Sequence, residues 1–232
     1  MINEKHLKEF KEVIEYVNES YNEFAKLRNV DNHVFEMEFE KVYSKILFTN
    51  AKKRYAARMI WKDGKRCDKV IAMGFSTRRS DTPAISRDFE KELFNLILKG
   101  EPKERVVKFV NEFKEKIRSV PIEQIAIPIG VSKDFNEYIN TPIHIRACEL
   151  ANKRHNANIH ANDKVKYVYV KRQPKSVSGS FENVIAFKNK MWDDYIIDYD
   201  KMTERLCDNK VNPVFEALRW NEGQNKSLAD WF

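Results

Sequence analysis

The sequence predicts an α+β fold in which one helix and antiparallel strands precede a mostly helical region. Two observations predict this fold. Apolar and β-forming residues alternate or form short runs between residues 34 and 75, whereas apolar residues recur at helical spacing before and after that segment. The 232 residues are 42% hydrophobic and 33% charged, which is typical of a folded chain that buries a core.

The first part of the chain is predicted to contain a helix followed by three strands. Apolar residues from Leu7 to Phe24 recur every three or four positions and place a helix over residues 4–27. Strands are expected over residues 34–49, 54–61 and 69–75. The Asp63-Gly64 pair, in the turn of residues 62–65, is the signal of a two-residue hairpin loop between the second and third strands.

Helices dominate the prediction from residue 82 onward. They are expected over residues 86–99, 102–118, 143–154 and 200–220, with one strand over 164–172 and a polar loop over 173–180. Gly100 ends the first of these helices, and Pro121 follows the second. We therefore expect one domain at residues 1–81, a second at 82–222 and a terminal tail at 223–232.

Residue spacing excludes several classes of protein. The six glycines lie at least ten positions apart, so G-x-G-x-x-G and G-x-x-x-x-G-K loops are absent, as is G-x-S-x-G. The three cysteines are far apart, which argues against a disulfide framework and favours a reducing, cytoplasmic location. No run of roughly 18 apolar residues predicts a membrane span. No spacing of histidines or cysteines predicts a metal site in this chain.

Positive charge is concentrated in one segment. The net charge is +7, and residues 41–79 carry twelve Lys or Arg against two Asp, so this segment contributes 12 − 2 = +10 and the rest of the chain 7 − 10 = −3. Aromatic residues are interleaved with the cations, a pattern that suits a polyanion such as nucleic acid. The alternative is a solvated, lysine-rich face.

Specific motifs give this charge a family context. Lys52-Lys53-Arg54-Tyr55, followed by an apolar strand, resembles the K-K-R-Y motif of family B DNA polymerases. Similar resemblances are found at residues 36–49 (the E-x-E-x-x-Y strand), 73–83 (the glycine-to-R-R-x-D-x-P segment, with Ser80 directly before the aspartate), 137–153 (the Pro-x-His core) and 165–170 (its following strand). The resemblance covers nearly the whole chain and implies the end of a polymerase palm followed by a thumb.

The resemblance also implies how DNA is bound. The residues it assigns to DNA are Lys52, Lys53, Arg54, Tyr55, Arg78, Arg79 and His144. Lys53 and Tyr55 are expected to share a strand face, with Lys53 reaching minor-groove acceptors that are present at every correct base pair. Lys52 and Arg54 then face phosphates or the fold, and His144 is a helix-start or phosphate contact. An ordinary exposed hairpin is the alternative.

The catalytic motifs of the family are missing. The sequence contains neither D-x-x-S-L-Y-P-S nor Y-G-D-T-D-S, and no K-x-x-x-N-S-x-Y-G helix. The resemblance therefore implies a small subunit or fragment, inactive alone, that completes the active site of a large polymerase fragment in the nucleoid. That partner would bind Mg²⁺, with possible assistance from Glu38 and Glu40, which are expected on one strand face. A solvated, lysine-paired face is the alternative for both glutamates.

Other readings of the whole chain stay open. A natural split gene is favoured over an expression fragment. The rival function is a stand-alone nucleic-acid-binding or regulatory protein without catalysis, and a nuclease is a weaker third.

The end of the chain resembles a sliding-clamp peptide. Asn225, Leu228, Trp231 and Phe232 follow the pattern of a polar residue, an aliphatic residue and two aromatics, with Asn225 where glutamine is usual. The three apolar residues fall on one face of a helical turn, which suits insertion into a hydrophobic groove. The alternative is that both aromatics fold back onto the thumb.

Overall fold

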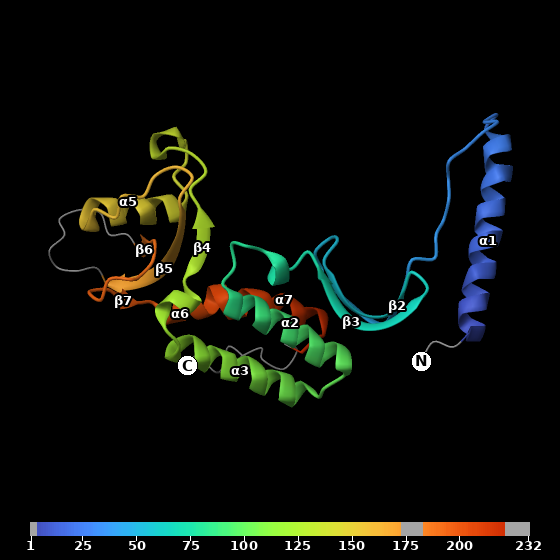
Figure 1. The fold of residues 1–232 in the computed structure, drawn as a ribbon. Coiled ribbons are helices and arrows are strands. Elements are labelled where there is room, and N and C mark those ends of the chain that lie inside the picture. The colour runs from blue at the N-terminus through green and yellow to red at the C-terminus, as the bar shows by residue number, and fades with distance from the viewer. Residues whose placement is uncertain (1–3, 173–182, 221–232) are drawn as a thin grey trace, which may run out of the picture. The chain divides into compact units, whose positions relative to one another are not determined.

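The computed structural model describes residues 4–172 and 183–220 of the chain (Figure 1). The chain folds into two compact units. Unit 1 comprises Met1–Leu47 and Ala56–Ile71, and unit 2 comprises Phe48–Tyr55 and Ala72–Phe232. The antiparallel sheets and helices confirm the α+β class. The expected functional boundaries at residues 81 and 222 stay predictions.

Unit 1 contains a long helix and most of a three-stranded sheet. The helix α1, Glu4–Leu27, begins and ends at the predicted residues. The sheet has the order β1-β2-β3 and consists of β1 (Lys41–Phe48), β2 (Tyr55–Lys62) and β3 (Lys65–Met73). Asp63 and Gly64 have φ values of +47° and +83°, as the predicted hairpin turn requires.

The first strand is shorter than predicted, because residues 34–40 are not part of the sheet. The side chain of Asn18 in α1 makes hydrogen bonds with the backbone of this segment instead. Its amide nitrogen donates to the Met37 carbonyl at 3.0 Å, and its amide oxygen accepts from the Met37 N–H at 2.7 Å. The Phe39 ring packs at a tilt against Trp61 of β2, with a ring-centroid distance of 4.6 Å. A side chain of the helix and this ring contact thus hold a segment whose alternating sequence resembles a strand.

Unit 2 begins with three helices and the turn that precedes them. After the short 3-10 helix η1 (Ser76–Arg78) come α2 (Ala84–Lys99), α3 (Lys103–Ser119) and α4 (Ile122–Ile125). Gly100 ends α2 with φ +89°, the left-handed conformation that favours glycine. Phe89 of α2 stacks on Phe113 of α3 at 4.0 Å, so the predicted apolar stripes of the two helices meet.

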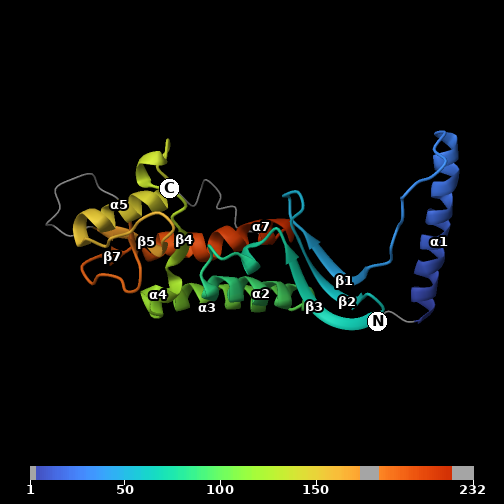
Figure 2. The same ribbon diagram turned by 45° about the horizontal axis from the view of Figure 1, so that its top comes forward.

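A second antiparallel sheet forms the other part of unit 2 (Figure 2). Its strands are β4 (Ile127–Gly130), β5 (Lys164–Arg172), β6 (Val184–Phe187) and β7 (Ile196–Ile197), and β5 pairs with each of the others. The 3-10 helix η2 (Phe135–Glu137) and the helix α5 (Ile143–His155) lie between β4 and β5 in the sequence, and α5 packs on β6. Only β5 was predicted, because the other strands have four residues or fewer.

The last predicted helix is interrupted. The structure has α6 (Tyr199–Thr203), a π-helical segment η3 (Glu204–Asp208) and α7 (Asn209–Ala217) in place of one regular helix. The buried Ser86 hydroxyl of α2 donates to the Leu206 carbonyl at 2.6 Å. A side chain from another helix therefore supplies a hydrogen bond where the regular ladder changes.

Two predictions lie outside the described residues: the polar loop at 173–180, and the tail with Asn225, Leu228, Trp231 and Phe232. Within the described ranges, no helix has both the length and the apolar character needed to cross a bilayer.

Candidate nucleic-acid interface

The K-K-R-Y residues lie at the turn between β1 and β2. Lys53 has φ +60°, and β2 begins only at Tyr55, so the prediction that Lys53 and Tyr55 share a strand face is wrong. The turn is closed by backbone bonds: the Arg54 N–H donates to the Ala51 carbonyl at 3.3 Å, and the Thr49 N–H donates to the Arg54 carbonyl at 3.2 Å. Lys52 and Lys53 are therefore presented by a turn, and both are exposed.

Gly74 holds this turn against the start of the R-R-x-D-x-P segment. It has φ +76°, and a Cβ added there would lie 3.0 Å from the Lys53 carbonyl oxygen and 3.2 Å from the Arg54 Cα. Backbone atoms cannot give way easily at such distances. Glycine is thus required here by both conformation and space.

Arg54 points inward, unlike the two lysines. Its guanidinium lies 4.4 Å from the centroid of the Phe75 ring, a cation–π contact. Its Nε is buried and has no hydrogen-bond partner among the described residues.

The two arginines of the R-R-x-D-x-P segment differ. Arg79 makes a bidentate pair with Asp81: its Nε donates to Oδ1 at 2.8 Å, and its Nη2 donates to Oδ2 at 2.5 Å. The hydrogen bond from Arg79 lowers the pKa of the Asp81 carboxyl below its usual range. Arg78 is exposed and has no ion-pair partner in the described parts of the chain. Of the two, Arg78 is the better placed for an external phosphate.

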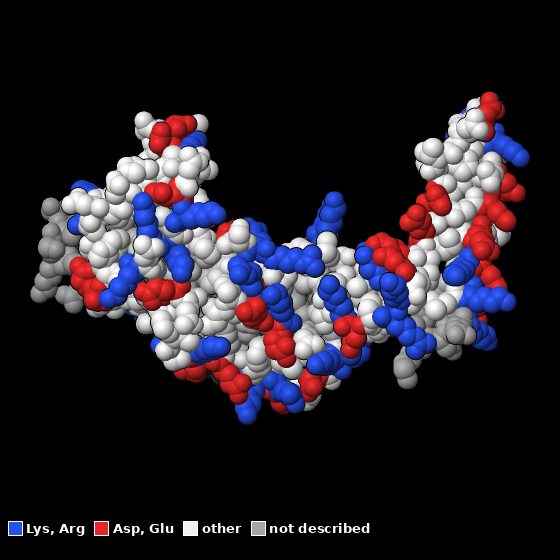
Figure 3. All heavy atoms as spheres, viewed as in Figure 1, with Lys and Arg blue, Asp and Glu red and all other residues white. Residues whose placement is uncertain are grey.

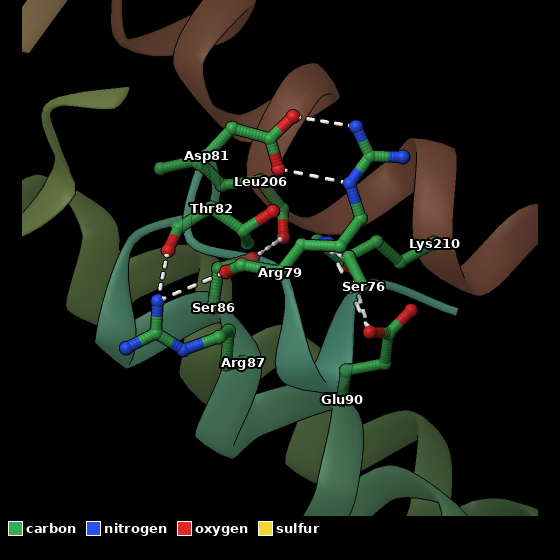
Figure 4. A network of polar contacts seen from close by, with 9 residues as sticks. All are labelled: Ser76, Arg79, Asp81, Thr82, Ser86, Arg87, Glu90, Leu206 and Lys210. Carbon is green, nitrogen blue, oxygen red and sulfur yellow. Dashed lines mark hydrogen bonds and ion pairs between the residues drawn. The ribbon is translucent and has the colours of Figure 1, made fainter. Parts of the chain in front are cut away.

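A buried polar network lies beneath this segment (Figure 4). Ser76 donates from Oγ to Glu90 Oε2 at 2.7 Å, and the Lys210 ammonium of α7 donates to the same Ser76 hydroxyl. Lys210 Nζ also lies 4.0 Å from Glu90 Oε2, and the two side chains are only 10% and 1% exposed. Burial lowers the pKa of Lys210, partly offset by the attraction of Glu90.

These residues line a cleft of about 400 Å³ in unit 2. Its cationic side chains are Arg54, Arg79, Arg205 and Lys210, and its acidic ones are Asp81 and Glu90. The sequence prediction missed Glu90, Arg205 and Lys210. The sequence did contain a signal for two of them: a charged residue next to an apolar one on the buried side of a helix. Glu90 follows Phe89 in α2, and Lys210 precedes Val211 in α7.

Elsewhere, cations and acids are mixed. Figure 3 shows Lys and Arg interspersed with Asp and Glu over α2 and α3 and along α1. Part of the predicted basic segment is also paired, since Arg58 contacts Asp68 through two hydrogen bonds of 2.7 Å. The segment is thus less uniformly cationic than its sequence suggests.

The remaining predicted residues are not among those that line the cleft. Glu38 and Glu40 precede β1, so the prediction that they share a strand face is wrong; both are exposed, and Glu40 Oε1 lies 2.5 Å from Lys41 Nζ. No group of three His, Cys, Asp or Glu able to hold a metal occurs in residues 4–172 and 183–220. That Glu38 or Glu40 assists a metal held by a partner stays a prediction. His144 is half-buried at the start of α5, and burial lowers its pKa.

Comparison with known proteins decides the family. Residues 2–218 match the family model for DNA polymerase family B. The chain belongs to this family. It is 27% identical to the DNA polymerase of Thermococcus gorgonarius over 230 residues, which cover 97% of this chain and 27% of that polymerase. It is 24% identical to DNA polymerase 2 of Aeropyrum pernix over 199 residues, 85% of this chain and 24% of the relative.

A solved family B polymerase shares this fold. The enzyme from the hyperthermophilic archaeon Pyrobaculum calidifontis has a TM-score of 0.61 and 25% sequence identity, over 89% of this chain and 24% of the enzyme. The chain thus spans about a quarter of the length of these polymerases.

Proposed function

We propose that this chain binds primer–template duplex as the end of the palm and the thumb of a family B DNA polymerase, and that it completes the active site of a larger polypeptide carrying the catalytic aspartates. One observation carries the DNA-binding role. Lys52, Lys53 and Arg78 are exposed, without ion-pair partners in the described residues, and lie on two segments that pack together through Gly74. Such cations are free to contact backbone phosphates or groove edges.

The apolar surface of unit 1 supports a polypeptide partner. Val13, Tyr16 and Leu27 of α1 are 60%, 73% and 80% exposed, and Val34 beyond it is 98% exposed. In addition, β1 is an edge strand of its sheet. Exposed apolar side chains and an unpaired strand edge are each typical of a surface that another chain covers. Mg²⁺ would then be held mainly by the partner's aspartates, and the complex would work in the nucleoid.

Primer extension tests this proposal. The chain would be assayed with Mg²⁺ alone and after co-expression with a polypeptide supplying the other three quarters of the polymerase. We expect incorporation only from the mixture, together with co-purification of the two chains. Robust extension by the chain alone would contradict its dependence on a partner. Duplex binding without co-purification would instead support a stand-alone nucleic-acid-binding protein.

The tail is proposed to bind a sliding clamp. Leu228, Trp231 and Phe232 occupy positions i, i+3 and i+4, and burying them provides roughly 1.5–3 kcal/mol for the aliphatic residue and somewhat more for each aromatic. Ordering the peptide offsets part of this gain, so we expect micromolar affinity. Calorimetry of a peptide ending in NKSLADWF against the cognate clamp tests it, and the absence of heat would exclude clamp binding.

A further inference from the structure

Two arginines that line the cleft of unit 2 have no carboxylate partner within residues 4–172 and 183–220. The two acidic residues of the cleft already form ion pairs: Asp81 with Arg79, and Glu90 with Lys210. The guanidinium of Arg54 contacts the Phe75 ring, and its Nε is buried without a hydrogen-bond partner in the described residues. Arg205 of η3 has a hydrogen bond with the Tyr167 hydroxyl, which is not an anion.

The cations that line the cleft repel one another. Arg54 and Arg79 both lower the pKa of Lys210, in addition to the larger effect of burial. Four cations against two acids leave an excess of two positive charges in one cleft of about 400 Å³. An anionic ligand would relieve this repulsion, and guanidinium groups are well suited to bind one through paired hydrogen bonds.

We propose that this cleft binds a phosphate group between Arg54 and Arg205. Arg54 is half-buried and lines the cleft, whereas Arg205 of η3 and Asn209 at the start of α7 are exposed and also line it. An entering phosphate would therefore meet donors from the K-K-R-Y turn on one side and from the C-terminal helix on the other. This inference extends the proposed DNA-binding role, and rests on it in naming a backbone phosphodiester as the source. The same chemistry would also accept free pyrophosphate.

Duplex binding by Arg205→Gln is the first test. Arg205 is exposed, so its replacement should leave the fold intact. We expect duplex affinity to fall about tenfold, and the slope of log affinity against log salt to decrease by about one, because each phosphate contact contributes about 0.9. Lys99→Gln is the matched control, since Lys99 is exposed at the end of α2 and does not line the cleft. It should change neither quantity.

A second measurement identifies the source of the phosphate. The melting temperature of the full chain is measured with and without inorganic pyrophosphate, for wild type and for Arg205→Gln. Reduced duplex affinity in the variant assigns the site to the DNA backbone. Unchanged duplex affinity with loss of a pyrophosphate-induced stabilisation assigns it to a free anion. If neither quantity differs between Arg205→Gln and wild type, the phosphate site does not exist. If wild type itself fails to bind duplex, the DNA-binding role fails, and the pyrophosphate measurement still decides the cleft.

Discussion

The buried pair of Glu90 and Lys210 is predicted to have a large coupling energy. The two side chains are 1% and 10% exposed and their charged atoms lie 4.0 Å apart. At that distance two unit charges attract by about 4 kcal/mol with an effective dielectric constant of about 20. Lys210→Met leaves the Glu90 charge buried without its cation, and Glu90→Leu leaves Lys210 in the same position. We expect each single change to destabilise the protein by about 3–5 kcal/mol.

The double variant should recover most of this loss. Burial outweighs the attraction of Glu90 in setting the pKa of Lys210, since the pKa is lowered. The pair as a whole is therefore not strongly stabilising, and Glu90→Leu with Lys210→Met should lie within about 1–2 kcal/mol of wild type. Urea unfolding of the four proteins gives the coupling energy directly. In thermal unfolding the single variants should lose about 10 °C.

An exposed ion pair provides the control. Lys201 and Glu204 lie 2.6 Å apart, but their side chains are 40% and 45% exposed. Their coupling energy should be below about 1 kcal/mol. If Lys210→Met is no more destabilising than Lys201→Met, the Glu90 charge is compensated in some other way and the reasoning from burial is wrong.

The lowered pKa of Lys210 also predicts a pH dependence. Between the lowered folded-state pKa and the unfolded value near 10.5, the unfolded chain binds more protons at this lysine than the folded chain does. The stability of wild type should therefore rise relative to Lys210→Met as the pH increases through this window. A difference that falls with pH would mean that Glu90 raises the pKa of Lys210.

Three further changes test the interface. Gly74→Ala should destabilise the protein by about 2 kcal/mol or more, because Gly74 combines positive φ with close backbone atoms. Gly64 also has positive φ but lies in open space, so Gly64→Ala should lower the free energy of unfolding by about 1 kcal/mol, measured in urea. Lys53→Ala should weaken duplex binding equally across template sequences, with an unchanged melting temperature; a large melting change with intact binding would make Lys53 structural. Deleting Asn225–Phe232 should spare basal extension on short primers and abolish stimulation by the clamp, and a lower melting temperature with unchanged stimulation would place the tail in the fold.

The long helices and the hairpin could be predicted from the sequence. Their signals are local: helical spacing sustained through α1, α2 and α3, and the Asp63-Gly64 turn. The structure of residues 34–40 could not be predicted, because an alternating pattern does not reveal which group forms hydrogen bonds with the backbone. Asn18 of α1 supplies that bond to Met37 through a contact between residues far apart in sequence.

The candidate site was predicted only in part. Lys52, Lys53 and Arg78 are exposed, as DNA contacts must be. The sequence grouped Lys52 with Arg54 as facing phosphates or the fold, but only Arg54 turns inward. Arg205 carries no local signal at all. It reaches the same cleft because α7 and η3 pack beside the segment that follows β3, an arrangement set by tertiary structure.

The length of the hairpin explains how two motifs distant in sequence become one surface. With a two-residue loop at Asp63-Gly64, the ideal register places Lys53 opposite Gly74. The 3.0 Å approach that a Gly74 Cβ would make to the Lys53 carbonyl agrees with this register. The K-K-R-Y turn and the R-R-x-D-x-P segment are thus brought together by strand length, and glycine permits the close contact. Arg54 and Arg78 consequently leave the same junction in different directions, one into the cleft and one toward solvent.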